Sequence, residues 1–467
     1  MTDYSPNIRK LLAISLWGFV LIALVLGYWQ IVMAPALNAS KYNQRQSLAL
    51  QRIRPGRVLT KDGVVILAPQ RQDGQWKFTY PAGSDFAHLT GYAPRTGLQY
   101  GLREPLYGMG QYADAWRDLL AGGPTGNDVI LTINSTAQKL AEEELDGRRG
   151  AVVALNPRTG ATLVLASAPT YDPAEVSSSQ EELDLLRFDP NVPELDRAVQ
   201  GLYPPGSVFK IFTAAVGLDL GLVTPETEFR CAGTERVAHT RVKCRILSGH
   251  GTLTLDKALW ASCNIAFAKL GDKIGIDNFI EYMKKFHLLD EANVGLPSKK
   301  GRMYDFRGFK GDAQLALASF GQGATMLTPL QVARLTAAIA NKGHVLQPYI
   351  ISQVTTPDKR VRMKGQAGDF GQAVKPETAH TLAGMMQDVV EKGTGRVAAI
   401  RGVSVAGKTG SAENPQGPAH GWFTCFAPVE NPQVVVTVLV EGGESGSESA
   451  GPIARKVLEE LLETQNR

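Results

Sequence analysis

The sequence predicts an α+β protein in which an antiparallel sheet is flanked by helices and carries a helical subdomain. Two observations predict this class. Apolar, β-branched runs typical of strands lie within residues 128–166 and again within 403–440. The stretch between them is dominated by helix-like patterns, from about Leu183 to Asn341. Strands at both ends of a helical middle are typical of the α+β layout.

The chain of 467 residues is too long for one ordinary domain, and we expect four regions. These are a cytoplasmic tail (1–10), a transmembrane anchor (11–33), a small irregular extracytoplasmic pedestal or dimerisation-like module (34–121) and a large globular region (122–467). The last boundary follows from a cluster of chain-breaking residues, Gly122–Asn127. The formal charge of +4 is close to neutral, and we see no basic stripe with interleaved aromatic residues. Nucleic acid is therefore not an expected partner.

The segment from Leu11 to Met33 contains 23 residues and no charged side chain. At about 1.5 Å per residue a helix of this length spans roughly 34 Å, enough for a hydrocarbon core of about 30 Å. A cleaved signal peptide is the alternative, but its apolar region would usually be only about 7–15 residues long. We therefore expect an uncleaved single-pass anchor. Basic residues lie on both sides of the segment, so flanking charge does not set its orientation.

The individual elements follow from periodicity and turn residues. Strands are expected at 128–133, 150–155, 161–166, 403–406, 421–427 and 434–440, with a hairpin turn at 156–160. Helices are expected at 135–145 with Ser135 as the N-cap, at 208–216, at 256–270 and at 453–463.

Three short motifs follow one another in order along the large region. They are Ser207-Val208-Phe209-Lys210, Ser262-Cys263-Asn264 and Lys408-Thr409-Gly410-Ser411. Each is weak alone, since S-x-x-K occurs by chance roughly twice in a chain this long. Together they supply a hydroxyl nucleophile, two amines able to manage its proton and small groups suited to binding a carboxylate. The set therefore predicts nucleophilic serine chemistry.

Ser207 and Lys210 are three residues apart, so on a helix they share a face, with Cβ atoms about 5–6 Å apart. A serine hydroxyl is a poor nucleophile unless an adjacent base removes its proton. Lys210 is such a base only if its pKa falls, and both burial and a second ammonium group, that of Lys408, push the pKa down. An ordinary surface serine and lysine are the alternative for one motif seen alone. The three motifs together favour catalysis.

Cys231 and Cys244 lie in a polar, Gly-containing stretch, and we expect a disulfide between them. Such a bond would close the loop between them and stabilise the fold by about 3 kcal/mol. It would also indicate an oxidising, extracytoplasmic compartment. There are two alternatives. One is a zinc site that includes His239 or His250, although no C-x-x-C or H-E-x-x-H spacing supports zinc. The other is that both thiols are unpaired. Two further cysteines lie in apolar runs and are expected only to pack in the core: Cys263 and Cys425.

On these motifs the sequence resembles the class B penicillin-binding proteins, which are membrane-anchored D,D-transpeptidases of bacterial cell-wall synthesis. The resemblance covers roughly residues 128–467, and the middle motif departs from the common pattern only at Cys263. Further landmarks of the resemblance are Gly150–Gly160, Tyr203–Ser207, Gly249–Gly251, Gly321–Gly323 and Thr328–Gln331. The sequence leaves no room for the separate glycosyltransferase domain of the bifunctional class.

The resemblance implies that Ser207 attacks the penultimate D-Ala carbonyl of a peptidoglycan stem peptide. It implies that Ser262 relays a proton between Lys408 and the leaving amine, and that Asn264 binds the peptide backbone. The terminal carboxylate would be held by Lys408 together with three neighbours on the same motif: Thr409, Gly410 and Ser411. The backbone N–H groups of Ser207 and Ser411 would form the oxyanion hole.

The implied partners are D-Ala-D-Ala donors, amine acceptors, β-lactams that acylate Ser207, the cell membrane and a polytopic membrane glycosyltransferase. No metal or organic cofactor is expected, and the catalytic domain would lie outside the cell. Two alternatives stay open. One is a hydrolase, either a D,D-carboxypeptidase or a β-lactamase-like enzyme, and the other is a scaffold that activates a membrane glycosyltransferase.

Overall fold

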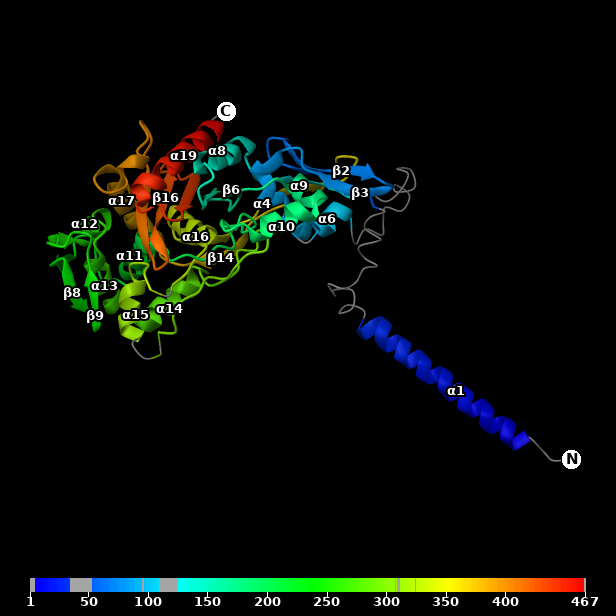
Figure 1. Ribbon diagram of the computed structural model, residues 1–467. Helices are drawn as coiled ribbons and strands as arrows, with labels where there is room; N and C mark the ends of the chain where they lie inside the picture. Colours follow the sequence, from blue (N-terminus) through cyan, green and yellow to red (C-terminus); the bar gives the residue numbers. More distant parts are fainter. Residues whose placement is uncertain are drawn as a thin grey trace. The chain divides into compact units, whose positions relative to one another are not determined.

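The computed structural model describes residues 5–33, 53–94, 96–108, 125–306, 308, 311–323 and 325–465 (Figure 1). Its central feature is a five-stranded antiparallel sheet in the order β15-β16-β17-β5-β6. The strands are β15 (Ala406–Asn414), β16 (Gly417–Ala427), β17 (Val434–Val440), β5 (Gly150–Leu155) and β6 (Thr162–Ala168). The predicted α+β class is confirmed. β17, which lies late in the chain, pairs with β5, the earliest strand of this sheet in the sequence.

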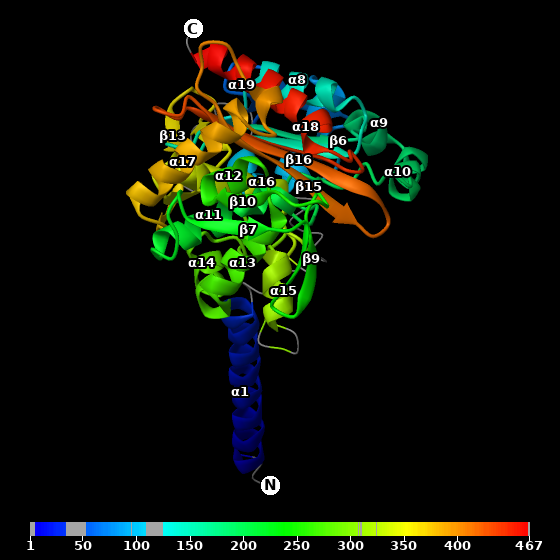
Figure 2. The same cartoon turned by 90° about the vertical axis from the view of Figure 1, so that its left-hand side faces the viewer.

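Helices cover both faces of this sheet (Figure 2). Alternate residues of β5 point to opposite sides, so that Val152 packs in one hydrophobic core and Val153 in the other. The core containing Val152 is closed by α8 (Ser135–Leu145) and α19 (Gly451–Gln465). The opposite core is closed by α16 (Pro329–Ala340). Burial on both faces explains why β5 and β17 read as continuous apolar runs rather than as alternating patterns.

The helical subdomain packs around a cluster of phenylalanine rings. Phe212 stacks on Phe209 at 4.8 Å between centroids and makes edge-to-face contacts with Phe279 and Phe286, with centroids 5.1 and 5.7 Å apart. The helices that contribute to this part are α11 (Lys210–Asp219), α12 (Leu255–Trp260), α13 (Asn264–Ile274), α14 (Ile276–Lys285) and α15 (Gly311–Ala318). α17 (Pro376–Glu391) packs against both α11 and α12.

Four short strands interrupt the segment that was predicted to be mainly helical. They form two pairs, β7 (Glu228–Cys231) with β10 (Gly251–Thr254) and β8 (Thr234–Val237) with β9 (Thr240–Lys243). Each has four residues, and most of their side chains are polar, so neither length nor hydrophobic alternation distinguishes them from loops. Two short helices precede the subdomain, α9 (Pro173–Ser178) and α10 (Gln180–Phe188).

A second sheet has the order β13-β12-β4-β1-β2-β3. Its strands are β13 (Val361–Lys364), β12 (Ile351–Thr355), β4 (Asp128–Leu131), β1 (Val58–Leu59), β2 (Val65–Gln72) and β3 (Gln75–Thr79). β1 pairs with β4 in parallel, with Val58 opposite Val129. Further elements include the β11 (His344–Gln347) and β14 (Gly368–Gln372) pair and the helices α4 (Ala87–Thr90), α5 (Gly97–Gly101), α6 (Arg103–Tyr107) and α18 (Gly446–Ser449).

The chain divides into two compact units. One unit contains the residues described within 55–69 and 78–108 together with those from Gly126 onward, so it combines part of the expected 34–121 module with the large region. The other unit includes α1 (Ser5–Gly27), the π-helical turn Tyr28–Val32 and Gln70–Lys77. Residues 122–124 of the predicted boundary lie outside the described residues.

The N-terminal helical segment Ile8–Val32 is 25 residues long and has a mean hydropathy of 2.4. By length and composition it is able to cross a membrane. The predicted helix 135–145 has the expected bounds, but its N-cap is Asn134, whose side chain accepts a hydrogen bond from the Ala137 amide, rather than Ser135. The Ser135 hydroxyl donates to the Asp62 carboxylate instead.

Candidate active site

Ser207 lies on a 3₁₀ turn, Gly206–Phe209, which leads directly into α11. In a 3₁₀ turn side chains three residues apart eclipse one another, so Ser207 and Lys210 lie in line. The turn depends on Gly206, whose φ is +56° and whose missing Cβ would lie 2.9 Å from the Ser411 carbonyl oxygen. The predicted helix 208–216 therefore begins two residues later, at Lys210, and the shared face of Ser207 and Lys210 comes from the turn before it.

The Lys210 amine is the centre of a hydrogen-bond network. Its Nζ lies 3.0 Å from Ser207 Oγ and 3.1 Å from Ser262 Oγ. It also donates to the Ser262 carbonyl oxygen at 2.7 Å and to Asn264 Oδ1 at 2.8 Å. One amine thus joins the first motif to the second.

Burial shifts the titration of both lysines. The Lys210 and Lys408 side chains are fully buried. Burial lowers the pKa of Lys210 to about 8, because the charged form loses its hydration. Burial also holds the pKa of Lys408 well below its ordinary value, and the positive charge of Lys210 adds to this effect. A substantial neutral fraction of Lys210 therefore exists near physiological pH, as a general base requires.

The Ser262-Cys263-Asn264 motif forms a break between two helices, which corrects the single helix expected at 256–270. α12 ends at Trp260, and α13 begins at Asn264. Ser262 has a φ of +58°, a left-handed conformation that is uncommon for residues other than glycine. This conformation turns the Ser262 hydroxyl toward Lys408, whose Nζ lies 3.0 Å from Ser262 Oγ. A helical Ser262 would not hold this backbone geometry.

The Lys408-Thr409-Gly410-Ser411 motif lies within β15, which begins at Ala406 rather than at Val403 and continues through the motif. A Cβ on Gly410 would lie 3.0 Å from Val208 Cγ1 and 3.0 Å from Trp422 Cβ. Glycine thus permits β15 to lie directly against the turn that carries Ser207. Trp422 is fully buried, as expected of a core residue, and its indole N–H donates to the Pro204 carbonyl at 3.0 Å.

The structure brings together Ser207, Lys210, Ser262, Asn264 and Lys408 through direct hydrogen bonds. The next three predicted residues, Thr409, Gly410 and Ser411, follow along β15, with Thr409 largely buried and Ser411 exposed. The Ser411 carbonyl accepts a hydrogen bond from Gln322 Nε2 at 3.5 Å.

Sequence reasoning missed two contributors to this site. Thr394 Oγ1 lies 2.6 Å from Thr409 Oγ1, and only its position between Gly393 and Gly395 hints at a special loop. The second is Gly321, whose carbonyl accepts from the Gly206 amide at 2.9 Å and whose own Cβ would collide with the Gly206 carbonyl. The run Gly321–Gly323 is a landmark of the resemblance, but the sequence does not predict its contact with the Gly206–Phe209 turn.

The expected disulfide between Cys231 and Cys244 is wrong, because all four cysteines are free and buried. Both sulfurs instead approach His250 Nδ1, at 3.4 Å from Cys231 and 3.5 Å from Cys244. Cys263 is buried as expected, but it does more than fill space, since its sulfur lies 3.7 Å from Cys244 Sγ. One potential ligand atom from each of Cys231, Cys244, His250 and Cys263 thus lies within 4.8 Å of all the others.

Comparison with known proteins agrees with this geometry. Residues 150–459 match the model of the penicillin binding protein transpeptidase domain. The chain is 32% identical to peptidoglycan D,D-transpeptidase PbpA of Mycolicibacterium smegmatis over 93% of its own length and 94% of the relative.

Two solved structures are also similar. The ceftriaxone acyl-enzyme of penicillin-binding protein A from M. tuberculosis has a TM-score of 0.81 at 30% identity, covering 88% of this chain and 99% of that one. The D,D-transpeptidase domain of a peptidoglycan glycosyltransferase from Eggerthella lenta has a TM-score of 0.78 at 33% identity, covering 89% and 99%.

Proposed function

The chain belongs to the penicillin-binding protein transpeptidase family, and we infer that it is a peptidoglycan D,D-transpeptidase that works through an acyl-enzyme on Ser207. Relatives with this domain are named peptidoglycan D,D-transpeptidases, and a similar structure is that of a β-lactam acyl-enzyme. The substrates are therefore the stem peptides of peptidoglycan, with β-lactams as acylating mimics.

We assign the first step to Ser207 and Lys210. Neutral Lys210 takes the hydroxyl proton as Ser207 Oγ bonds to the penultimate D-Ala carbonyl carbon. The tetrahedral intermediate then expels the terminal D-Ala, whose nitrogen gains a proton through the Ser262 hydroxyl, backed by Lys408. An amine from a second stem peptide attacks the ester in the reverse sense, and Ser207 recovers its proton.

Substrate positioning is assigned to the residues around this network. Asn264 has a side-chain carboxamide next to Lys210 and is suited to bind the peptide backbone. Lys408 with Thr409, Gly410 and Ser411 is assigned to the terminal carboxylate. The backbone N–H groups of Ser207 and Ser411 are assigned to the oxyanion, where one such donor is typically worth about 2.7–4 kcal/mol in the transition state. The closeness of Gly206 to Ser411 supports this pairing.

The observation that carries the assignment is the 3.0 Å contact between the buried Lys210 amine and Ser207 Oγ. The test is intact-protein mass spectrometry after treatment with a fluorescent penicillin. The wild type should gain one adduct and Ser207→Ala none. An adduct of equal yield on Ser207→Ala would overturn the assignment of the nucleophile.

Hydrolysis is separated from transfer by the lifetime of that adduct. A transpeptidase whose site excludes water should keep the penicilloyl ester for hours, whereas an efficient β-lactamase clears it. A stem-peptide donor incubated with an amine acceptor should yield the cross-linked dimer in preference to the shortened peptide. Release of the shortened peptide alone would indicate a D,D-carboxypeptidase.

The membrane placement rests on Ile8–Val32, which is long and apolar enough to span a bilayer. We propose a single-pass protein whose catalytic region lies outside the cell, where peptidoglycan is found. A polytopic glycosyltransferase partner is proposed as well, because cross-linking requires newly polymerised glycan. Protease protection of intact spheroplasts tests the orientation, and polymerisation by a candidate glycosyltransferase with and without Ser207→Ala separates scaffolding from catalysis.

A further inference from the structure

Three thiols and one imidazole converge beside the catalytic network. Cys231 ends β7, Cys244 follows β9, His250 precedes β10 and Cys263 lies between α12 and α13. We call these four residues the thiol–imidazole cluster. One potential ligand atom from each residue lies within 4.8 Å of all the others. Four separate segments of chain therefore contribute to one point in space.

Three of the distances within the cluster are close to the edges of a metal-centred tetrahedron, and the others are at most 4.8 Å. With Zn–S bonds of about 2.3 Å and Zn–N bonds of about 2.0–2.1 Å, tetrahedral geometry places sulfurs about 3.8 Å apart and sulfur about 3.6 Å from nitrogen. Cys244 Sγ and Cys263 Sγ are 3.7 Å apart. His250 Nδ1 lies 3.4 Å from Cys231 Sγ and 3.5 Å from Cys244 Sγ.

The surroundings hold the cluster in place. The side chains of Cys231, Cys244 and Cys263 are at most 4% exposed. Two glycines with positive φ let the loops meet at the backbone: a Cβ on Gly233 would collide with the Leu247 carbonyl, and one on Gly249 with the Cys231 carbonyl. The Cys244 amide also donates to the Gly233 carbonyl at 2.8 Å. Four ligand side chains are thus preorganised by packing.

We propose that the thiol–imidazole cluster binds one Zn²⁺ ion as a structural Cys₃His site. Soft thiolate sulfur with imidazole nitrogen in tetrahedral arrangement is the donor set that zinc prefers. On binding, each of the three thiols releases its proton to solvent and its sulfur becomes a thiolate ligand, while His250 binds through neutral Nδ1. No electron transfer is involved. A disulfide, in contrast, would use two sulfurs and leave the third thiol and the imidazole unexplained.

The proposed ion would also fix the middle motif of the active site. Cys263 lies between Ser262 and Asn264, and both neighbours bond to Lys210. The Asn264 amide donates to Cys244 Sγ at 3.3 Å, so a second ligand contacts the same motif. A metal held by Cys244 and Cys263 would therefore maintain the left-handed turn at Ser262. This consequence rests on the proposed function, whereas the metal site itself does not.

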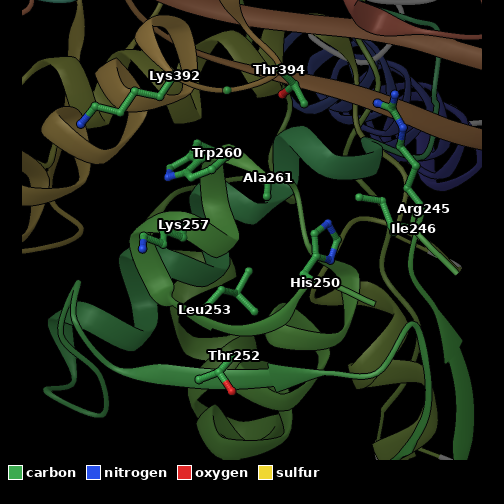
Figure 3. Close-up of a pocket in the computed structure, with 11 residues that line it drawn as sticks. Arg245, Ile246, His250, Thr252, Leu253, Lys257, Trp260, Ala261, Lys392 and Thr394 are labelled. Carbon is green, nitrogen blue, oxygen red and sulfur yellow. The ribbon is translucent and has the colours of Figure 1, made fainter. Parts of the chain in front are cut away.

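A cavity of about 470 Å³ reaches the cluster at His250. Figure 3 shows His250 on its wall, with Trp260 and Ala261 of the neighbouring helix end nearby. The imidazole is only partly buried, so it is the ligand through which zinc would enter and leave. Chelators small enough for this cavity should then be able to remove the ion without unfolding the chain.

The direct test is metal analysis of the full chain purified in detergent, without added chelator. Plasma mass spectrometry should find about one zinc per chain. Cobalt(II) exchanged into the chelated protein should give the intense visible bands of a tetrahedral thiolate site. Cys231→Ala and His250→Ala should lower the zinc content at least about tenfold.

Matched controls keep the test specific. Cys425→Ala removes a buried cysteine outside the cluster, and His239→Ala removes an exposed histidine of the same loop region; both should retain the zinc. Equal loss in the controls would overturn the site. So would a metal-free wild type that is about 2 Da lighter than its reduced form, since this mass identifies a disulfide. If the cluster variants fail to fold, the cobalt spectrum of the wild type by itself tests whether a tetrahedral thiolate site exists.

Coupling to the active site is tested separately. Removing zinc from the wild type should slow penicillin acylation at least about tenfold, and adding zinc back should restore it. Ser207→Ala should keep its zinc but never be acylated. Zinc present without an effect on acylation would overturn the coupling and leave the metal site standing. Absence of acylation in a zinc-loaded wild type would overturn the proposed function instead.

Discussion

Lys210 and Lys408 both reach the same hydroxyl: their Nζ atoms lie 3.1 Å and 3.0 Å from Ser262 Oγ. Two ammonium groups this close, without exposure to solvent, repel each other and favour loss of a proton. Ser262 therefore lies between two amines that are able to exchange protons through it.

Lys210→Met should slow acylation of Ser207 by about 10²–10⁴-fold, because the variant keeps the buried volume but lacks the base. The measurement is the second-order rate constant for a fluorescent penicillin. Lys285→Met, which removes an exposed lysine on α14, is the control and should react like the wild type. A Lys210→Met enzyme within about twofold of the wild type would remove Lys210 from the mechanism.

Acylation should accelerate with rising pH and level off above an apparent pKa near 8, since burial lowers the pKa of Lys210 to about 8 and only the neutral amine accepts a proton. Counting covalent adducts, rather than lost antibiotic, avoids interference from alkaline hydrolysis of the β-lactam. A profile that is flat from pH 6 to 10 would contradict the lowered pKa. Lys408, whose pKa is also lowered by burial, is the other amine that titrates nearby.

The lowered pKa of Lys210 also makes the free energy of unfolding depend on pH. The unfolded Lys210 has a pKa near its ordinary value of 10.5, so between about pH 8 and 10.5 the unfolded chain binds more protons than the folded one. The free energy of unfolding should therefore rise with pH across this window on account of Lys210. Lys210→Met should remove that part of the slope in urea titrations at several pH values. An unchanged slope in the variant would show that Lys210 is not the group responsible.

Gly206→Ala should both destabilise the protein and slow acylation. The left-handed φ costs an alanine roughly 1–2 kcal/mol, and its Cβ would press on the Ser411 carbonyl. Gly221→Ala is a matched control, because Gly221 has a φ of +66° with nothing within 4 Å of its Cβ position. The control should lose stability but acylate normally. Equal acylation in both variants would show that the contact between Gly206 and Ser411 does not shape the site.

Arg197→Met should lower the free energy of unfolding by about 3–5 kcal/mol, because it leaves the partly buried Glu441 carboxylate without its closest cationic partner. Arg197 is 2% exposed and lies 2.7 Å from Glu441 Oε1, an oxygen that also accepts from the Tyr203 hydroxyl. Arg149 contacts the same carboxylate at 3.2 Å but is 46% exposed, so Arg149→Met should cost at most about 1 kcal/mol. Denaturant titration distinguishes the two, and similar losses would contradict the argument from burial.

Much of the sheet is predictable because its strands are apolar on both faces. The bounds expected for β5 and β17 are those observed, and the hairpin between β5 and β6 forms as expected. The order of the three motifs predicted which side chains lie together. It did not predict the backbone conformations that bring them together. The left-handed turn at Ser262 was missed, because serine in an otherwise helical pattern carries no signal for φ > 0.

The thiol–imidazole cluster was anticipated only in part, since a zinc site at Cys231 and Cys244 with a nearby histidine was one open alternative but Cys263 was expected only to pack. Cys231, Cys244, His250 and Cys263 have no regular spacing, and they come together only because four short strands fold the intervening loops. Cys263 in particular has the burial of an ordinary core residue, so hydrophobic context alone predicts packing. Tertiary contact, not local pattern, decides its neighbours.

The pairing of β17 with β5 has a consequence during translation. The ribosome makes the segment with Ser207 long before the strand with Lys408, yet the sheet lacks its middle until Val434–Val440 inserts between the early hairpin and β16. A nascent chain therefore has Ser207, but the strand that carries Ser411, its proposed oxyanion partner, cannot yet join the sheet through β17. Truncated or unfinished copies should be chemically silent toward both cell wall and antibiotic.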